Sequence, residues 1–172
     1  MCELRCPAMR NHIVLVVMAL LVLGVSVPAH ALDLEATALI GSGVDTGKNP
    51  NNPYALQIGG AVELIVAGYV AGIRATRAVS SGDAPSKFDL RTFGGDLGWE
   101  WEIALLHIGP RLGLGRVSSL NEDFHEFYLE PGGVAEIEVG WFVAGADIRF
   151  RVVPKESDVN GLLAYAKIGL RL

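Results

Sequence analysis

Residues 54–64 read YALQIGGAVEL, and this stretch decides the fold. Apart from Gly60, its even positions carry bulky apolar side chains from Leu56 to Leu64, whereas the odd positions carry Gln57 and Glu63. A period of two is typical of a β-strand that presents two chemically different faces. The same alternation recurs along the chain as far as Leu172. We therefore predict an all-β protein whose strands have one apolar face and one polar face.

The first 31 residues have the pattern of an export signal. Arg5 and Arg10 give a basic start, an apolar run follows over residues 13–27, and residues 29–31 (AHA) form a small-x-small cleavage pattern. The apolar run is shorter than the ~20 residues that a spanning helix needs, although a membrane anchor is the alternative interpretation. We predict a signal peptide over residues 1–31, cleaved after Ala31, and a single domain over residues 32–172.

Charge and cysteine content limit the classes of function. The chain has 14 basic and 19 acidic residues. Without Glu3, Arg5 and Arg10, the mature part has 12 and 18, a net charge of −6, which argues against nucleic acid as a partner. Cys2 and Cys6 both precede the cleavage site, so the mature chain can form no disulfide and must gain stability elsewhere. A closed barrel in a bilayer is one such source of stability, because it satisfies every backbone polar group internally.

Eight strands follow from the alternation, with lengths that bracket the span of a tilted transmembrane strand. They cover Asp33–Gly41, Tyr54–Val66, Tyr69–Val79, Phe88–Glu102, Leu105–Val117, Glu126–Val139, Trp141–Val153 and Leu162–Leu172. Polar connections follow the odd strands, and very short turns follow the even ones, near Ala67-Gly68, Ile103 and Val139-Gly140. Long loops on one rim and tight turns on the other are typical of an antiparallel up-and-down transmembrane β-barrel.

Two local features refine this picture. The first half of the fourth strand is out of phase with its second half, so a β-bulge is expected near Thr92. Pro110 and Pro131 each remove a ladder hydrogen bond from a strand. If their hairpin folds about Leu120-Asn121, the two prolines lie directly opposite each other on the apolar face.

Alternation alone leaves open which face meets lipid. Either the apolar face points outward into a bilayer, or a soluble periplasmic or secreted lipocalin-like barrel holds that face inside and binds a lipid. Glycine on the charged face and the lack of a helical pattern after the strands favour the first interpretation. So do aromatic residues of the apolar face near both rims, as expected at lipid interfaces. They are Tyr54, Tyr69, Trp99, Trp101, Phe127, Phe142 and Phe150.

The charged face then fills the barrel. The predicted polar network of the lumen consists of Glu63, Arg74, Asp96, Glu100, His107, Arg111, Glu136, Asp147, Arg149 and Lys167. Across all eight strands, ten acidic residues, including Asp33, Glu102 and Glu138, face six basic ones. Because an eight-stranded barrel is just wide enough for side chains, we expect ion pairs and no open pore. The excess of four acids predicts trapped water, a bound cation or carboxyls with raised pKa values.

A signal peptide, eight alternating strands, four polar loops, three tight turns and an apolar last residue resemble the small outer-membrane barrels of the OmpA-membrane-domain and OmpX kind. The resemblance covers residues 32–172 and rests on no diagnostic motif. It implies the outer membrane of a Gram-negative bacterium, with the barrel-insertion machinery as an assembly partner. One departure is that those proteins usually end in an aromatic residue, whereas this chain ends in Leu172.

The sequence contains no arrangement that we assign to catalysis or to metal binding. His107 is placed in the polar core and His125 in a loop, and acidic pairs such as Glu100 and Glu102 suit salt bridges better than calcium. A lipid-modifying enzyme would need a Ser/His pair on the lipid face, which we do not find. We expect a monomeric, non-enzymatic barrel without cofactor, in contact with outer-membrane lipid, with a structural, envelope-integrity or surface-interaction role.

Overall fold

The computed structural model describes residues 32–46, 52–79, 89–119, 124–156 and 159–172, all within the unit Leu32–Leu172. The predicted signal peptide and the predicted strand start at Phe88 lie outside the described residues. In the described ranges, no helix has both the length and the apolar character needed to cross a membrane.

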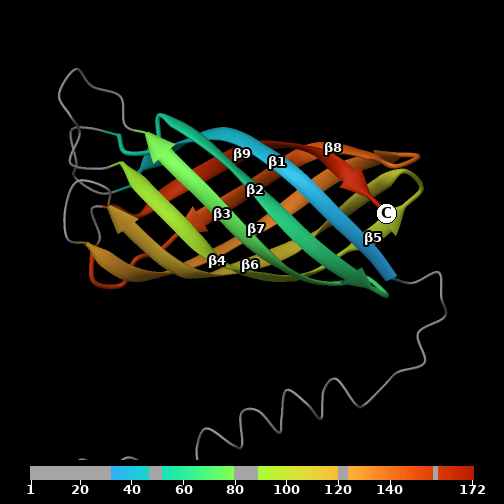
Figure 1. Cartoon of the computed structure of the whole chain (residues 1–172), viewed down its shortest axis with the longest axis horizontal. Helices are drawn as coiled ribbons and strands as arrows, with labels where there is room; N and C mark the ends of the chain where they lie inside the picture. The colour runs from blue at the N-terminus through green and yellow to red at the C-terminus, as the bar shows by residue number, and fades with distance from the viewer. Residues whose placement is uncertain (1–31, 47–51, 80–88, 120–123, 157–158) are drawn as a thin grey trace, which may run out of the picture. The chain divides into compact units, whose positions relative to one another are not determined.

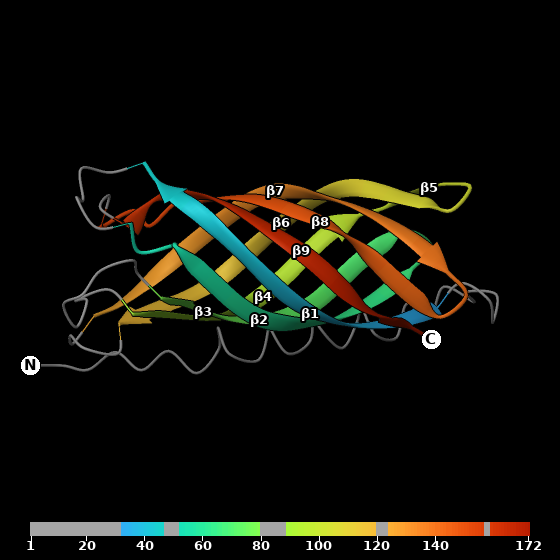
Figure 2. The ribbon, with the colours of Figure 1, turned by 90° about the horizontal axis from the view of Figure 1, so that it is seen from above.

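The described residues form a closed antiparallel β-barrel with eight strand positions around its wall (Figures 1 and 2). Its strands are β1 (Leu32–Asp45), β2 (Leu56–Val66), β3 (Tyr69–Val79), β4 (Leu90–Trp99), β5 (Trp101–Ile103), β6 (Leu106–Ser119), β7 (His125–Val139), β8 (Phe142–Arg151) and β9 (Gly161–Arg171). Consecutive strands pair from β1 to β4 and from β5 to β9, β4 pairs with β6, and β1 pairs with β9 to close the barrel. Since β4 and β5 pair with β6 in one continuous register, they occupy a single strand position of the barrel wall. The predicted up-and-down barrel is confirmed.

Three two-residue turns join neighbouring strands on one rim, after β2, β5 and β7, as the sequence predicted. Ala67 and Gly68 both have positive φ angles, 51° and 85°, the combination that matches the right-handed twist of paired strands. The second turn is formed by Ala104 and Leu105, just after the predicted position at Ile103, and Ala104 has a φ of 58°.

The bulge expected near Thr92 is wrong. Every residue from Leu90 to Trp99 has a partner on β3 in an uninterrupted register. The phase of the strand therefore never changes, and Leu90 simply points inward, where it is buried. The misinterpretation came from assuming that every bulky apolar side chain faces lipid, whereas the loop end of the interior is apolar.

The direct opposition of Pro110 and Pro131 is also wrong. Pro110 pairs with Gly133 and Pro131 with Leu112, so the hairpin is centred one residue further along the chain than predicted. Both prolines stay on the outer face, because a shift of two residues in pairing preserves the face. This register sets glycines of β6 opposite large inward side chains of β7, Gly113 opposite Glu130 and Gly115 opposite Tyr128.

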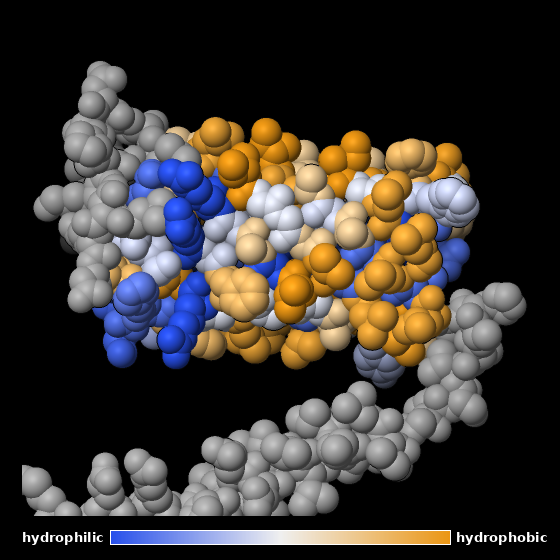
Figure 3. Space-filling model, viewed as in Figure 1, coloured by the Kyte–Doolittle hydropathy of each residue, from blue (hydrophilic) through white to orange (hydrophobic). Residues whose placement is uncertain are grey.

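The two faces of the barrel have the polarity of a membrane protein. Ile108 and Phe142 are 40% and 66% exposed, whereas Glu100, Arg111 and Asp147 are at most 6% exposed. On the side of the barrel seen in Figure 3, orange apolar side chains cover much of the surface, and hydrophilic residues gather toward the loop rim. The lipocalin-like alternative is wrong, because it requires the apolar face inside.

Candidate functional site

All ten residues predicted for the polar network lie inside the barrel, and none is more than 9% exposed. Nine of them come from seven different strands, and the tenth is Glu100, which separates β4 from β5. Strand alternation aims each of them at the axis, and neighbouring strands bring them to common levels. Their contacts form two ion-paired clusters, one in the middle of the barrel and one toward the turn rim.

The middle cluster consists of Arg74, Asp96, Asp147 and Arg149. Arg149 donates from Nε to Asp147 Oδ1 at 2.5 Å and from Nη1 to Asp96 Oδ1 at 3.2 Å. Arg74 forms an ion pair with Asp96 at 3.0 Å and also bonds Asp147. Each arginine thus contacts both carboxylates, although Arg74 and Asp147 lie 73 positions apart in sequence. Such mutual pairing is what makes buried charges tolerable.

The cluster near the turn rim gathers carboxylates around three cationic side chains. Lys167 Nζ lies 2.6 Å from Glu35, 3.2 Å from Glu63 and 2.9 Å from Glu136. Arg171 contacts Glu35, Glu100 and Glu136 as well, at 2.5, 3.0 and 3.1 Å. These six residues therefore form one connected set of ion pairs, and no single pair holds the network together.

Two further residues complete this cluster. Arg111 donates to Glu100 at 2.5 Å. The ring of His107 lies between carboxylates, with Nδ1 3.2 Å from Glu100 and Nε2 3.3 Å from Glu138. Its Nδ1 is also 2.9 Å from Arg171 Nη1. His107 is thus a member of the polar interior.

The interior of the described barrel does not contain the predicted excess of four acidic residues over basic ones. Seven acidic side chains are buried there, against six basic ones and His107. Three acids counted as inward lie near the turn rim instead: Glu102 is exposed, and Asp33 and Glu138 are half-buried. They lie at strand ends, where alternation no longer implies burial. The described residues contain no group of three or more His, Cys, Asp or Glu side chains placed to hold a metal ion.

The loop end of the interior is closed by an apolar cluster that sequence reasoning missed. It consists of Leu39, Tyr54, Ala61, Ala78, Leu90, Val117, Tyr128, Val153, Val159, Leu163 and Tyr165, with Phe124 packed against it. A signal was available, since Leu39, Leu163 and Tyr165 occupy the inward phase of their strands. Together with the ion pairs, this cluster fills the lumen.

Tyr54 is the one predicted interface aromatic that the structure contradicts. Its side chain is fully buried, its hydroxyl donates to the Val159 carbonyl, and its ring lies 5.3 Å from the Arg151 guanidinium. The cause is local: β2 begins at Leu56, and Tyr54 belongs to the turn before it, so the strand phase does not extend to it. Burial raises the pKa of the Tyr54 hydroxyl above its ordinary value, partly offset by Arg151, which keeps the hydroxyl a donor.

The other predicted interface aromatics lie on the outer surface. Tyr69, Trp101, Phe127, Phe142 and Phe150 are exposed, between 40% and 66%. Trp99 is half-buried because it packs edge-on against Tyr69, with ring centroids 4.2 Å apart.

The Tyr54→Phe substitution tests the buried placement. We expect it to lower the free energy of unfolding by about 1 to 3 kcal/mol, because the buried Val159 carbonyl loses its donor. The matched control is Tyr69→Phe, which removes a hydroxyl from an exposed ring and is expected to change stability by less than about 0.5 kcal/mol. Urea unfolding of the protein folded in phosphatidylcholine vesicles measures both. Equal losses in the free energy of unfolding would contradict the buried placement of Tyr54 and favour a position at the lipid interface.

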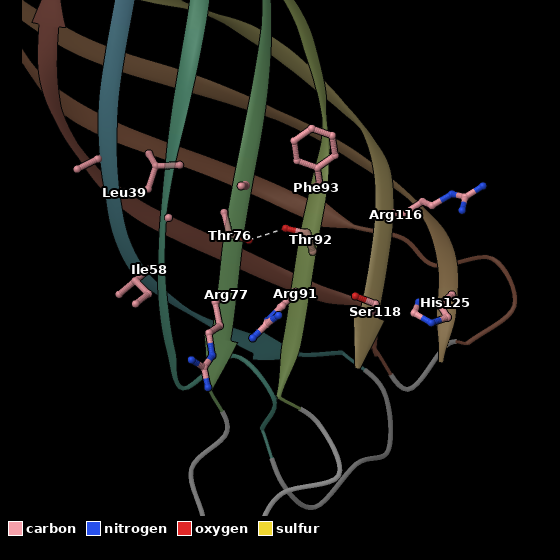
Figure 4. A pocket seen from close by; sticks show the side chains of 13 residues that line it. Leu39, Ile58, Thr76, Arg77, Arg91, Thr92, Phe93, Arg116, Ser118 and His125 are labelled. Carbon is pink, nitrogen blue, oxygen red and sulfur yellow. Dashed lines mark hydrogen bonds between the residues drawn. The ribbon is translucent and has the colours of Figure 1, made fainter. Parts of the chain in front are cut away.

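One expectation about chemistry needs correction. The sequence indicated no Ser/His pair on the lipid face, but the β6–β7 register sets Ser118 opposite His125 near the loop rim. Both line the same surface hollow (Figure 4). The pair was missed because it depends on hairpin register, which spacing along the sequence does not reveal.

This chain is similar in fold to solved structures. No family model matches the sequence, and no curated protein matches it either. The crystal structure of Neisserial surface protein A (NspA) is similar with a TM-score of 0.57 and 15% sequence identity, covering 82% of this chain and 96% of that one. Ail, the attachment invasion locus protein of Yersinia pestis, is similar with a TM-score of 0.53 and 16% identity, covering 83% and 99%. At such identities the likeness concerns the fold, and it confirms the resemblance inferred from sequence: this chain has the fold of the small eight-stranded outer-membrane β-barrels.

Proposed function

We propose that this protein is a non-enzymatic barrel of the outer membrane of a Gram-negative bacterium, exported by a signal peptide cleaved after Ala31. In this role it contributes to envelope integrity or presents its loops to partners outside the cell. The observation that carries the proposal is the polarity of the barrel, apolar outside and ion-paired inside. An apolar band around a closed barrel is stable in hydrocarbon.

The filled interior supports a structural or surface role over transport. Ion pairs occupy the middle and the turn end, and the apolar cluster around Tyr128 and Leu163 closes the loop end. A barrel of this size encloses side chains and leaves no aqueous channel. Any partner therefore meets the loops or the outer surface. The name of Ail, an attachment invasion locus protein, agrees with a role of that kind.

Localisation and conductance test the proposal together. The full chain, expressed in a Gram-negative host, is expected in the outer-membrane fraction and should migrate differently on a denaturing gel before and after heating. In planar bilayers it should show no open-channel current, because paired side chains fill the lumen. A control chain without residues 1–31 should not reach the outer membrane. Recovery of the full chain in the soluble periplasmic fraction would contradict the proposal.

A lipid hydrolase is the rival function, and Ser118 opposite His125 is the observation that favours it. Against it, the Ser118 hydroxyl in Figure 4 is directed toward β4, while His125 lies on the other side, on β7. A nucleophile and its base must lie within hydrogen-bond reach. The discriminating assay measures ester hydrolysis of a bilayer lipid by the folded protein and by Ser118→Ala. We expect no turnover from either, and turnover abolished by Ser118→Ala would favour the hydrolase.

A further inference from the structure

A hollow of about 880 Å³ lies on the barrel wall near the loop rim, across β1, β2, β3, β4, β6 and β7 (Figure 4). Its lining combines small residues, such as Ala38 and Ala75, with the aromatic ring of Phe93 and with three arginines. Those arginines, Arg77, Arg91 and Arg116, all have exposed side chains. We call them the arginine cluster.

The register of the strands concentrates positive charge at this place. Arg77 lies directly opposite Arg91 across β3 and β4, a like-charge pair that costs stability unless an anion accompanies it. Arg116 is on the neighbouring β6, opposite Phe93. Among the described residues one acid pairs with the cluster, Asp89, at 3.2 Å from Arg77. Two of the three guanidinium charges are therefore left without an ion pair to a described side chain.

This concentration is not a general property of the outer surface. The described residues include ten Lys and Arg side chains, of which six are buried in the interior. The exposed four are the arginine cluster and Lys155. Lys155 is itself paired with Glu126, at 3.5 Å. All outward arginines of the described barrel thus lie on three adjacent strands, β3, β4 and β6.

An apolar groove continues from the hollow toward the middle of the barrel. A second depression, of about 380 Å³, shares Ala75 and Phe93 with the first and is lined on its outer side by Val62 and Ile73. Gly60 and Ala75 pair across β2 and β3. Because both residues are small, a depression remains between the larger side chains around them. The surface is therefore cationic toward the loop rim and apolar below it.

We propose that the arginine cluster and the groove below it bind a phosphorylated lipid of the outer leaflet, with the phosphate at the arginines and an acyl chain along Phe93 and Ile73. Guanidinium groups bind phosphate through several charge-assisted hydrogen bonds. The cluster lies between the apolar band and the loops, at the level where headgroups meet a barrel. This inference rests on the proposed function, since it names the lipid class that the barrel wall contacts.

Native mass spectrometry of the detergent-solubilised, folded protein tests the proposal, because its result does not depend on cellular location. Three probes are titrated: bisphosphorylated lipid A, the same lipid with its phosphates removed, and inorganic phosphate. We expect the phosphorylated lipid to bind at least about 5-fold more tightly than the dephosphorylated one. Arg91→Gln and Arg116→Gln should each weaken it about 5-fold, and together about 25-fold, from the usual contribution of one basic side chain at an anionic membrane surface.

The matched control is Lys155→Gln, which removes one exposed positive charge outside the cluster and should leave the affinity unchanged. Unchanged binding of the dephosphorylated lipid by the double variant would support a groove that holds the acyl chain independently. Equal affinity for the two lipids would overturn the proposal, as would an equal loss with Lys155→Gln. Competition by inorganic phosphate at the affinity of the lipid would overturn the assignment to a lipid. A barrel that fails this test but fractionates with the outer membrane still satisfies the proposed function.

Discussion

Replacing Arg149 by methionine is expected to lower the free energy of unfolding by about 3 to 5 kcal/mol, the usual cost of removing one partner of a buried ion pair. Arg149 contacts both Asp96 and Asp147 and is only 1% exposed. Without it, two buried carboxylates share Arg74 alone. Urea unfolding in phosphatidylcholine vesicles, followed by heat-dependent gel mobility, measures the change.

A second substitution separates charge imbalance from lost packing. Adding Asp147→Asn to Arg149→Met removes one of the two stranded charges, so we expect part of the lost stability to return. Lys155→Met serves as the control, because its pair with Glu126 is solvent-exposed and such pairs contribute about 0 to 1 kcal/mol. A barrel that tolerates Arg149→Met as well as Lys155→Met would contradict a cooperative ion-paired interior.

Replacing Gly94 by valine is expected to destabilise the barrel by about 3 kcal/mol, at the upper end of ordinary overpacking. Gly94 points inward and lies opposite Gly115, and the hydroxyl of Tyr128 occupies the space between the two. A Cβ atom at Gly94 would lie 2.5 Å from that hydroxyl and 2.9 Å from the Gly115 Cα. The backbone of β6 cannot yield as a flexible side chain would.

The neighbouring glycine provides the control for this prediction. Gly95 points outward, and a Cβ atom there would have its nearest contact at 3.5 Å, to the Gly72 carbonyl. Gly95→Val should therefore be neutral or slightly stabilising, since β-branched residues favour strands. The same unfolding assay compares the two variants. Similar losses at both positions would mean that the lumen beside Tyr128 is not tightly filled.

The periodicity of the sequence sufficed to predict the barrel and the direction of most side chains. Alternation is a local property, because successive Cβ atoms of a strand point to opposite faces whatever the strand pairs with. Charge on one face and bulky apolar groups on the other, as in residues 54–64, then select the face for lipid. The ten network residues follow from that choice, and all ten are inside.

Tertiary structure decided everything that depends on which strands meet and at what level. Arg74 joins Asp147 across 73 residues because barrel closure and strand tilt set the level of each side chain. The same cause accounts for three other features: the apolar cluster that includes Tyr54, the offset of Pro110 from Pro131, and the grouping of Arg77 with Arg91. A period of two specifies a face but carries no information about register, so contacts between strands become known only once the cylinder is closed.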